Sequence, residues 1–363
     1  MSTVQSHTKF VPNDYDVFAG LDVDKKSISV TFLEHSGQMK QIKMPYDSHQ
    51  LMSYVRNRYT GKKVAFVYES GPTGFGLYDD LTSAKYFCMV TSASKVPTEP
   101  SNRVKTNRID SKKLSENLRG GQLKEIHVPT EHYRELRHLV QLRDTFVKQL
   151  KSTKLRIKSL LLVKGIPFPD DEHKWSYSTI RKLKDTNCSE AIKFHLDRLI
   201  LSLEFFRSNV LDTTRNIRAF CKHNEEINRN IQFLISIPGI GFITASQLLA
   251  RIGDWRKLYR FDQIGSFLGL VPSEHSTGDD VCRGSITRTG NTNLRCKLIQ
   301  CAWKAIQIDP QLNKFYNTIY NRNRNDYGEI KAITAVARKL TTRIYAVLTQ
   351  QRNYKLRNKP EDN

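Results

Sequence analysis

The first third of the chain alternates short apolar runs with stretches of helical spacing. Residues 17–33 hold two apolar runs around a polar turn, and a third extended run in SGQMKQIKMPY completes the pattern of a β-meander. Further on, two amphipathic helical stretches each precede a continuous apolar run typical of a buried strand. Strands that alternate with helices predict a layered α/β domain. The helical stretches are residues 48–59 and 74–84, and the apolar runs are residues 63–70 and 86–93.

A basic, proline-bounded loop, PTEPSNRVKTNR, then leads into a helical segment that ends on the glycines at 120–121. From residue 131 apolar side chains recur at heptad-like spacing, stop at KGIPFPDDEHKW, and resume at residue 196. Two long helices joined by a proline-rich turn predict an antiparallel hairpin or a dimerising arm, with an ordinary helical bundle as the alternative. The apolar positions are Leu136, Leu139, Val140, Phe146, Val147, Leu150, Ile157, Leu160, Leu161, Leu196, Leu199, Ile200, Leu203, Phe206, Val210 and Ile217.

The last third of the chain has a mainly helical pattern. The segment LISIPGIGFITASQLLARIGDW places a tight turn between two helical stretches, and residues 294–307 and 333–348 are amphipathic enough to close a small helical core. Residues 269–291, GLVPSEHSTGDDVCRGSITRTGN, show no sustained helical or strand period. The predicted parts are a disordered N-terminus (1–16), an α/β domain (17–128), a helical arm (129–230), a mainly helical domain (231–350) and a polar, basic, disordered tail (351–363).

The charge of the chain indicates its partner. Among 363 residues, 58 Lys and Arg face 36 Asp and Glu, which gives a formal net charge of +22. Such a field attracts a polyanion, so nucleic acid is the expected partner. A membrane is not expected, because no apolar run approaches the ~18 residues that a spanning helix needs.

The cysteines and the N-terminus indicate the compartment. The cysteines are scattered, and none has the spacing of a zinc site or a CxxC motif. The first residues, MSTVQSHTKFVPNDYD, lack the apolar core of a secretory signal. Both observations predict a cytoplasmic protein with reduced thiols. The cysteines are Cys88, Cys188, Cys221, Cys282, Cys296 and Cys301.

Three acidic residues occupy positions where an α/β sheet places ligands. Asp22 and Glu69 each end an apolar strand run, and Asp110 starts the helix after the basic loop. Converging carboxylates repel one another unless a divalent cation neutralises them, and an oxygen-only ligand set suits Mg²⁺ or Mn²⁺. Paired metals can activate a nucleophile and stabilise a leaving oxygen at a phosphodiester. The alternative is that these acids only cap their strands and helix.

Two glycine-containing segments could contact phosphate. In PGIG, Gly239 and Gly241 allow a tight turn that leaves backbone N–H groups free at the start of the next helix, as in a helix-hairpin-helix. The alternative is an ordinary glycine-assisted turn between helices. In residues 269–291 a hydroxyl could attack phosphorus while arginines clamp the phosphate, or the stretch could be a solvated loop. The hydroxyls are Ser273, Ser276, Thr277, Ser285, Thr287 and Thr289, the glycines are Gly278, Gly284 and Gly290, and the arginines are Arg283, Arg288 and Arg295.

The order of these pieces resembles a known family. FAGLDVDKKSISV, VYESGPTGFGLYDDL, VKTNRIDSKKLSENL and, after the arm, SIPGIGFITASQLL and RGSITRTGNTNLR resemble the DEDD-type insertion-sequence transposases and the related Piv-type DNA invertases. The resemblance covers about residues 17–350. It implies a RuvC-like (RNase H-like) mixed-sheet domain, a coiled-coil arm, and a mainly α-helical transposase domain with a nucleophilic serine.

The resemblance also implies an activity and partners. Members of the family cut and rejoin DNA at a composite site in which the RuvC-like domain of one subunit meets the serine domain of another, so a homo-oligomer, a dimer or tetramer, is expected. Transposases of this family use a structured bridge RNA that pairs with donor and target DNA. The protein is therefore expected to bind DNA and a guide RNA, with magnesium or manganese, in association with the nucleoid.

The acidic positions of the family transfer to this chain with one departure. The resemblance places its first Asp on Asp22, its Glu on Glu69 and its last Asp on Asp110. Where the family has KTDxxDA this chain has KTNRIDS, so Asn107 takes the place of an acid and Lys105 of the same motif is expected to contact nucleic acid. An Asn carbonyl can bind Mg²⁺ but adds no negative charge, which Asp24 could compensate.

The nucleophile position departs as well. The family pattern ends in Ser-Gly, whereas this chain reads HSTG, so alignment favours Thr277. Chemistry favours Ser276, because the β-methyl of threonine crowds an attack at phosphorus. Arg283, Arg288 and Arg295 match the family and are expected to bind phosphate. The competing functions are a metal-dependent junction nuclease that uses the acids alone and a catalytically degenerate nucleic-acid-binding protein.

Overall fold

The structure is a computed structural model that describes residues 10–92, 96, 107–169, 174–257, 260–277, 280–288, 290–324 and 327–356, with backbone only for residues 107, 257, 274–277 and 280–283. The chain divides into two compact units, residues 1–128 and residues 129–363. Each unit has its own core and is described by itself.

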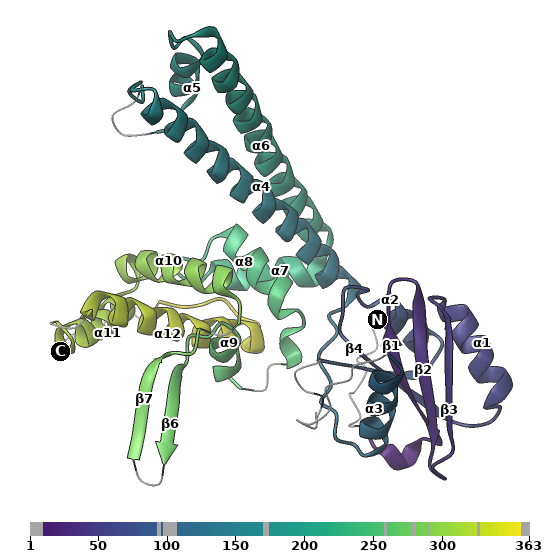
Figure 1. Cartoon of the computed structure of the whole chain (residues 1–363). Coiled ribbons are helices and arrows are strands. Elements are labelled where there is room, and N and C mark those ends of the chain that lie inside the picture. The colour runs from purple at the N-terminus through teal and green to yellow at the C-terminus, as the bar shows by residue number, and fades with distance from the viewer. Residues whose placement is uncertain are drawn as a thin grey trace, which may run out of the picture. The chain divides into compact units, whose positions relative to one another are not determined.

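The first unit is built on a five-stranded mixed sheet (Figure 1). Its strand order is β3-β2-β1-β4-β5, with β1, β2 and β3 antiparallel and β1, β4 and β5 parallel. The predicted mixed α/β domain is confirmed, and this order is compatible with an RNase H-like fold. The strands are β1 (Val17–Val23), β2 (Ser27–Glu34), β3 (Met39–Pro45), β4 (Val64–Glu69) and β5 (Phe87–Thr91).

Helices cover both faces of this sheet. Alternate residues of β1 face opposite sides, and Val17, Ala19 and Leu21 pack with α1 (Ser48–Arg58) and α2 (Gly76–Ser83). On the other face Phe18 packs with α3 (Asn107–Arg119). Burial on both faces explains why β1 and β4 read as continuous apolar runs rather than as alternating patterns.

The residues just before β1 are ordered. On either side of the short 3-10 helix η1 (Pro12–Asp14), Phe10 stacks on Phe87 of β5 with ring centroids 4.9 Å apart, and Tyr15 packs against Phe87 in a tilted arrangement at 5.4 Å. This differs from the expectation of a disordered segment over residues 1–16, because two aromatic side chains anchor its second half. Residues 1–9 lie outside the described part of the chain.

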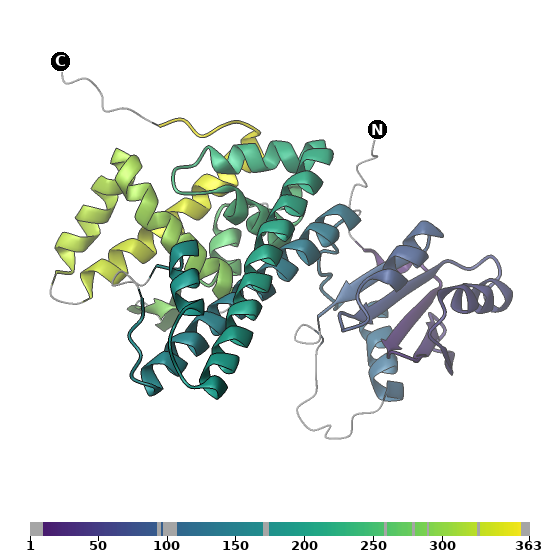
Figure 2. The same ribbon diagram turned by 90° about the horizontal axis from the view of Figure 1, so that it is seen from above.

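A helical arm begins the second unit. Helices α4 (Glu131–Val163) and α6 (Glu190–His223) pack along each other, and α5 (Tyr177–Lys184) lies between them in sequence (Figure 1; Figure 2). Both long helices lie in the range where heptad-like spacing predicted them. A cluster at the tip joins all three helices, made of Ile157, Leu161, Ile180, Leu183, Leu196, Ile200 and Leu203.

The base of the arm belongs to the core of the helices that follow it. Tyr133, Leu136 and Val140 of α4 and Ile217 and Cys221 of α6 are buried in the same cluster as those helices. The arm and the helical domain, expected as separate parts, therefore share one hydrophobic core. The following elements are α7 (Glu225–Ile235), α8 (Phe242–Ile252), η3 (Trp255–Lys257), α9 (Asp262–Phe267), α10 (Thr292–Ile308), α11 (Pro310–Arg322) and α12 (Gly328–Gln350).

One carboxylate fastens the arm to this core. Asp144 of α4 accepts hydrogen bonds from the Gln247 amide at 2.7 Å, the Asn293 amide at 3.0 Å and the Lys297 ammonium at 3.2 Å. Asp144 is therefore a common partner for residues of α8 and α10. Hydrogen bonds to a charged group are stronger than neutral ones, so this junction fixes the base of α4.

The start of the C-terminal tail is also held. The Tyr354 backbone N–H donates to the Ser236 hydroxyl at 2.7 Å, and the Tyr354 hydroxyl donates to Asp309 at 2.8 Å. The tail was predicted to be disordered, and these contacts show that its first residues pack on the helical unit. In the described residues no helix is long and apolar enough to cross a bilayer.

Candidate active site

The ends of two neighbouring parallel strands bring Asp22 and Glu69 to the same edge of the sheet. The last paired residues of β1 and β4 are Leu21 and Tyr68, and the two acids come directly after them. Val67 of β4 belongs to the cluster that packs against α3, and Glu69 lies two residues further on the same strand. Because side chains alternate along a strand, both acids lie on the sheet face that α3 covers.

Helix α3 brings the third acid over this edge. The Ser111 hydroxyl is hydrogen-bonded to the Thr31 hydroxyl of β2 at 2.8 Å, and the Gln41 side chain of β3 bonds to Arg108. These contacts fix the first turn of α3, which carries Asp110. Sequence reasoning missed the Thr31–Ser111 pair, because neither residue is distinctive by itself.

The three acids interact electrostatically. Burial raises the pKa of Asp22 above its usual value, and the charges of Asp110, Glu69 and Asp24 raise it further. Neighbouring negative charges disfavour ionisation, so the Asp22 carboxylate lies within electrostatic range of Asp110 and of Glu69. Asp24 itself is exposed and its carboxylate accepts the Lys25 backbone N–H.

The acids are close without forming a finished metal-binding cluster. Over the described residues no group of three or more His, Cys, Asp or Glu side chains is arranged to hold a metal ion. The donor set itself suits a hard divalent cation, because it offers only oxygen and carries a mutual repulsion that a cation would relieve. Asn107 begins α3, its side chain lies outside the described atoms, and Lys105 lies outside the described residues.

Gly20 makes the approach of α3 possible. A Cβ at this position would lie 2.1 Å from the Ser111 carbonyl oxygen and 2.5 Å from the Ser115 backbone nitrogen. No side chain fits there without moving the helix that carries Asp110. The glycine therefore sets the distance between α3 and β1.

We expect Gly20→Ala to destabilise the first unit by about 1–3 kcal/mol, the usual cost of overpacking a core. Urea unfolding of the full chain measures this change. Gly71→Ala is the matched control, since its Cβ would meet nothing closer than 3.9 Å and should leave the unfolding midpoint in place. Equal stability of both variants and the parent would show that α3 tolerates the displacement.

The hydroxyl-rich stretch is a β-hairpin. Strands β6 (Pro272–Thr277) and β7 (Asp280–Ile286) pair antiparallel and project from the helices of the second unit (Figure 1). The alternative of a solvated loop therefore does not hold for the paired residues of this stretch, which form two strands. A two-stranded ribbon that covers no core needs no alternation of apolar and polar residues. Such a ribbon therefore leaves no periodic signal in the sequence. In the register, Ser276 lies opposite Val281 and Thr277 opposite Asp280, which is the pair nearest the end of the two strands.

The base of the hairpin is fastened to the end of α9. The Thr287 N–H donates to the Val271 carbonyl at 2.9 Å, and the Arg288 N–H donates to the Gly269 carbonyl at 3.3 Å. Arg288 is exposed and adopts a φ of 56°. Its predicted contact with phosphate stays a prediction, and the side chain of Arg283 lies outside the described atoms.

Arg295 has a structural role that the sequence did not reveal. It is 8% exposed, and its guanidinium donates to the Leu268 carbonyl at 2.9 Å and to the Thr292 hydroxyl at 3.1 Å. The sequence analysis assigned it to phosphate binding on the basis of its type and motif. In the folded chain it holds α10 against the end of α9, beside the base of the hairpin.

The PGIG segment forms the turn between α7 and α8. Gly239 has a φ of 86°, and a Cβ there would lie 2.3 Å from the Cys301 carbonyl oxygen of α10. This glycine therefore serves the packing of the turn on α10. Gly241 is exposed and is the N-cap residue of α8, with no side-chain cap bonded to the first N–H groups of the helix.

Comparison with known proteins assigns the family. A DEDD-type IS110 transposase model matches residues 19–164, and the model of the transposase IS116/IS110/IS902 family matches residues 231–317. A transposase of Sinorhizobium fredii, y4qE, is 30% identical over 83% of this chain and 75% of its own length. The transposase for insertion sequence element IS1111A of Coxiella burnetii is 26% identical over 69% of this chain and 68% of its own. The pilin gene-inverting protein of Moraxella bovis is 31% identical over 36% of this chain and 40% of its own. The chain belongs to the IS116/IS110/IS902 family of transposases, the DNA-recombining enzymes of insertion sequences.

Proposed function

We propose that this transposase cuts and rejoins DNA with two sets of groups, the carboxylates of Asp22, Glu69 and Asp110 and a hydroxyl at the tip of the β6–β7 hairpin. The observation that supports the proposal is the placement of the three acids: Asp22 and Glu69 directly follow the paired ends of β1 and β4, and Asp110 lies in the first turn of α3, which packs on the same sheet face. Burial and the charges of Asp110 and Glu69 raise the pKa of Asp22, which is the energetic cost of this arrangement. Structural acids that only cap strands would have no reason to crowd together at this cost.

The acids are proposed to hold a divalent cation. The DEDD-type family suggests a dependence on divalent metal, and the oxygen donors here favour Mg²⁺ or Mn²⁺, with the Asn107 carbonyl as a neutral fourth ligand. When bound, such an ion stabilises the negative charge that develops on phosphate oxygens during cleavage. Because Asn107 replaces an acid, we expect weaker metal binding than four carboxylates would give.

The hairpin is proposed to supply the nucleophile, Ser276 or Thr277. The hydroxyl oxygen forms a bond to phosphorus, the bond from phosphorus to one DNA oxygen breaks, and that oxygen leaves with a proton as a free hydroxyl end. The protein–DNA phosphodiester keeps the energy of the original bond, so resealing needs no ATP. Arg288, exposed at the base of the hairpin, could neutralise the phosphate.

The two candidate positions are distinguishable. Neighbouring positions of a strand belong to opposite faces of the ribbon, so a phosphate on one face is within reach of only one of them. A covalent protein–DNA adduct, trapped by denaturation after incubation with element-end DNA and Mg²⁺, should vanish in either Ser276→Ala or Thr277→Val and persist in the other variant.

Ser285→Ala is the control, because it removes a hydroxyl from the same hairpin and should keep the adduct. Cleaved DNA with free ends and no adduct in the parent would overturn the proposed nucleophile and indicate a metal-dependent junction nuclease. Neither cleavage nor adduct, with DNA binding retained, would indicate a catalytically degenerate binding protein.

A structured guide RNA and a homo-oligomer, a dimer or tetramer, complete the proposal. The net charge of +22 supports a large load of nucleic-acid phosphate. Protein purified from cells that carry the whole element should contain a protected RNA with short matches to the element junctions. Purification without such an RNA, from cells in which the element excises, would contradict the guided mechanism.

A further inference from the structure

Helix α11 (Pro310–Arg322) exposes an unusual set of side chains. Its sequence, PQLNKFYNTIYNR, contains no acid. A solvated helix face usually mixes acids with bases, which stabilise each other at helical spacing. From Asn313 to Arg322, the exposed residues are three asparagines, one threonine, one lysine and one arginine: Asn313, Lys314, Asn317, Thr318, Asn321 and Arg322.

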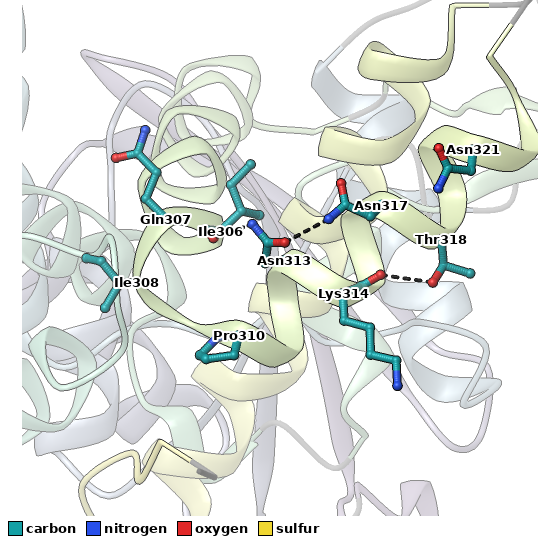
Figure 3. A pocket seen from close by; sticks show the side chains of 9 residues that line it. All are labelled: Ile306, Gln307, Ile308, Pro310, Asn313, Lys314, Asn317, Thr318 and Asn321. Carbon is teal, nitrogen blue, oxygen red and sulfur yellow. Dashed lines mark hydrogen bonds between the residues drawn. The ribbon is translucent and has the colours of Figure 1, made fainter. Parts of the chain in front are cut away.

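The asparagines form a row along one side of the helix. Asn313, Asn317 and Asn321 are four residues apart, so they lie on one stripe with about 6 Å between neighbours along the axis. The Asn317 amide donates to the Asn313 side-chain oxygen at 2.7 Å, which orients the first two (Figure 3). The stripe lines an open groove of about 530 Å³ where α10 turns into α11.

The buried side of α11 is held rigidly. Asp309 caps the helix by accepting the Gln311 and Leu312 N–H groups, and Leu312 is fully buried. The Tyr316 ring packs 5.8 Å from the ring of Trp303 on α10. A binding face on a helix fixed in this way loses little conformational entropy when it meets a partner.

The chemistry of this face matches the base edges of DNA. Asn pairs through two hydrogen bonds with the N6 and N7 edge of adenine, and the major groove of B-form DNA is wide enough for an α-helix. Lys314 and Arg322 are also exposed, about 60° and about 140° around the helix from Asn317, where they can meet the phosphates that flank the groove. The deep, narrow major groove of an RNA duplex would not admit the helix.

We propose that α11 is a recognition helix that enters the major groove of duplex DNA and reads adenine-containing base pairs with Asn317 and Asn321. The proposal rests on the proposed function, since it assumes that the enzyme acts on DNA. In this proposal the protein itself recognises part of the DNA sequence, in addition to the part that pairs with the guide RNA. The target is duplex DNA beside the cleavage site, which a guide RNA does not unwind.

The test is selection by the full chain from a pool of DNA duplexes with a randomised centre. The parent should enrich adenine-containing duplexes. The double variant Asn317→Ala/Asn321→Ala should lose this enrichment and bind the selected duplex about thirtyfold more weakly or worse, the range for losing two specific base contacts. Asn313 is left in place because it donates to the Ile306 carbonyl and so supports the fold.

Two further variants make the result specific. Gln50→Ala/Asn57→Ala removes two exposed amides from α1 and should select like the parent. Lys314→Gln should weaken binding to every duplex without changing the selected sequence. The slope of the logarithm of the binding constant against the logarithm of the salt concentration should become shallower by about one.

The proposal is overturned if the parent enriches no sequence, or if the Asn317→Ala/Asn321→Ala protein enriches the same sequence as the parent. Thermal unfolding of that protein should match the parent, because alanine favours an exposed helix. The covalent-adduct assay keeps the two proposals separate. An adduct without selection refutes only the recognition helix, and selection without an adduct refutes only the nucleophile.

Discussion

Replacing Asp22 with Asn is expected to reduce element excision roughly a thousandfold while leaving the protein at least as stable as the parent. Changes in residues that merely support metal ligands already cost about 10–100-fold, so loss of a ligand should cost more. A thousandfold loss corresponds to about 4 kcal/mol of transition-state stabilisation. An excision assay in cells and thermal unfolding of the purified protein measure the two effects.

The expected stability of Asp22→Asn follows from the raised pKa of Asp22. A raised pKa means that the folded protein disfavours the ionised carboxylate more than the unfolded chain does. At neutral pH the charge therefore lowers stability, and the neutral amide should restore it. A purely structural Asp22 would give the opposite result, with lower stability.

Asp24→Asn is the matched control, because Asp24 lies two residues away and is exposed. It should keep most excision activity. Added Mg²⁺ should raise the unfolding temperature of the parent, since ligands stabilise the state that binds them, and should have a smaller effect on Asp22→Asn. Full excision by Asp22→Asn would refute the role of the acids.

The second large effect is expected at the buried ion pair between Asp309 and Arg343. Asp309 is 2% exposed, and its carboxylate bonds to the Arg343 guanidinium and the Tyr354 hydroxyl. Asp309→Ala leaves the Arg343 charge buried without this carboxylate and removes the cap of α11. We expect a loss of about 3–5 kcal/mol in the free energy of unfolding, measured by urea denaturation.

The same pair predicts a pH dependence. Burial alone would raise the pKa of Asp309, but the hydrogen bond from Tyr354 and the charge of Arg343 outweigh it and lower that pKa. A lowered carboxyl pKa stabilises the fold above the unfolded-state value of ~3.9, and this contribution disappears as the pH falls through the folded value. As the pH falls from roughly 5 to roughly 3, the parent should therefore lose more free energy of unfolding than Asp309→Ala does.

Asp212→Ala is the control for this prediction. Asp212 forms an ion pair with Arg215 at 3.0 Å on the exposed arm, where the two side chains are 53% and 77% exposed. An exposed pair contributes about 1 kcal/mol or less. A similar cost for both variants would show that the Asp309 pair contributes no more than a surface contact.

Much of the first unit could be predicted from the sequence, because its sheet is buried on both faces. The runs around Phe18 and Phe66 are continuous and apolar, and the turns between them carry polar or glycine residues, so both strands and the acids at their ends were visible. Parallel pairing of β1 with β4 then placed Asp22 beside Glu69. The resemblance to a family supplied the roles of these acids, which spacing alone left open.

The rest depended on contacts that a linear pattern does not contain. The β6–β7 hairpin covers no core, so its strands carry no apolar alternation. The burial of Arg295 depends on the Leu268 carbonyl 27 positions earlier in the chain. The close approach of α3 to β1 at Gly20 is likewise visible only in the packing. In the sequence FAGLDV, the glycine has no feature that distinguishes it from any other glycine in a strand.

The arm has a mechanical consequence. Helix α4 has 33 residues, which makes it about 50 Å long, and its first turns are part of the core of the second unit. A tilt of ~7° about Asp144 would displace the far end of α4, 19 residues or about 28 Å away, by about 3.5 Å, the scale of a base step in DNA. The arm is thus a lever whose pivot is the junction at Asp144, where Gln247, Asn293 and Lys297 meet one carboxylate. A small rearrangement of α10, which begins just after the hairpin, would be amplified into a displacement at the tip that a neighbouring molecule could detect.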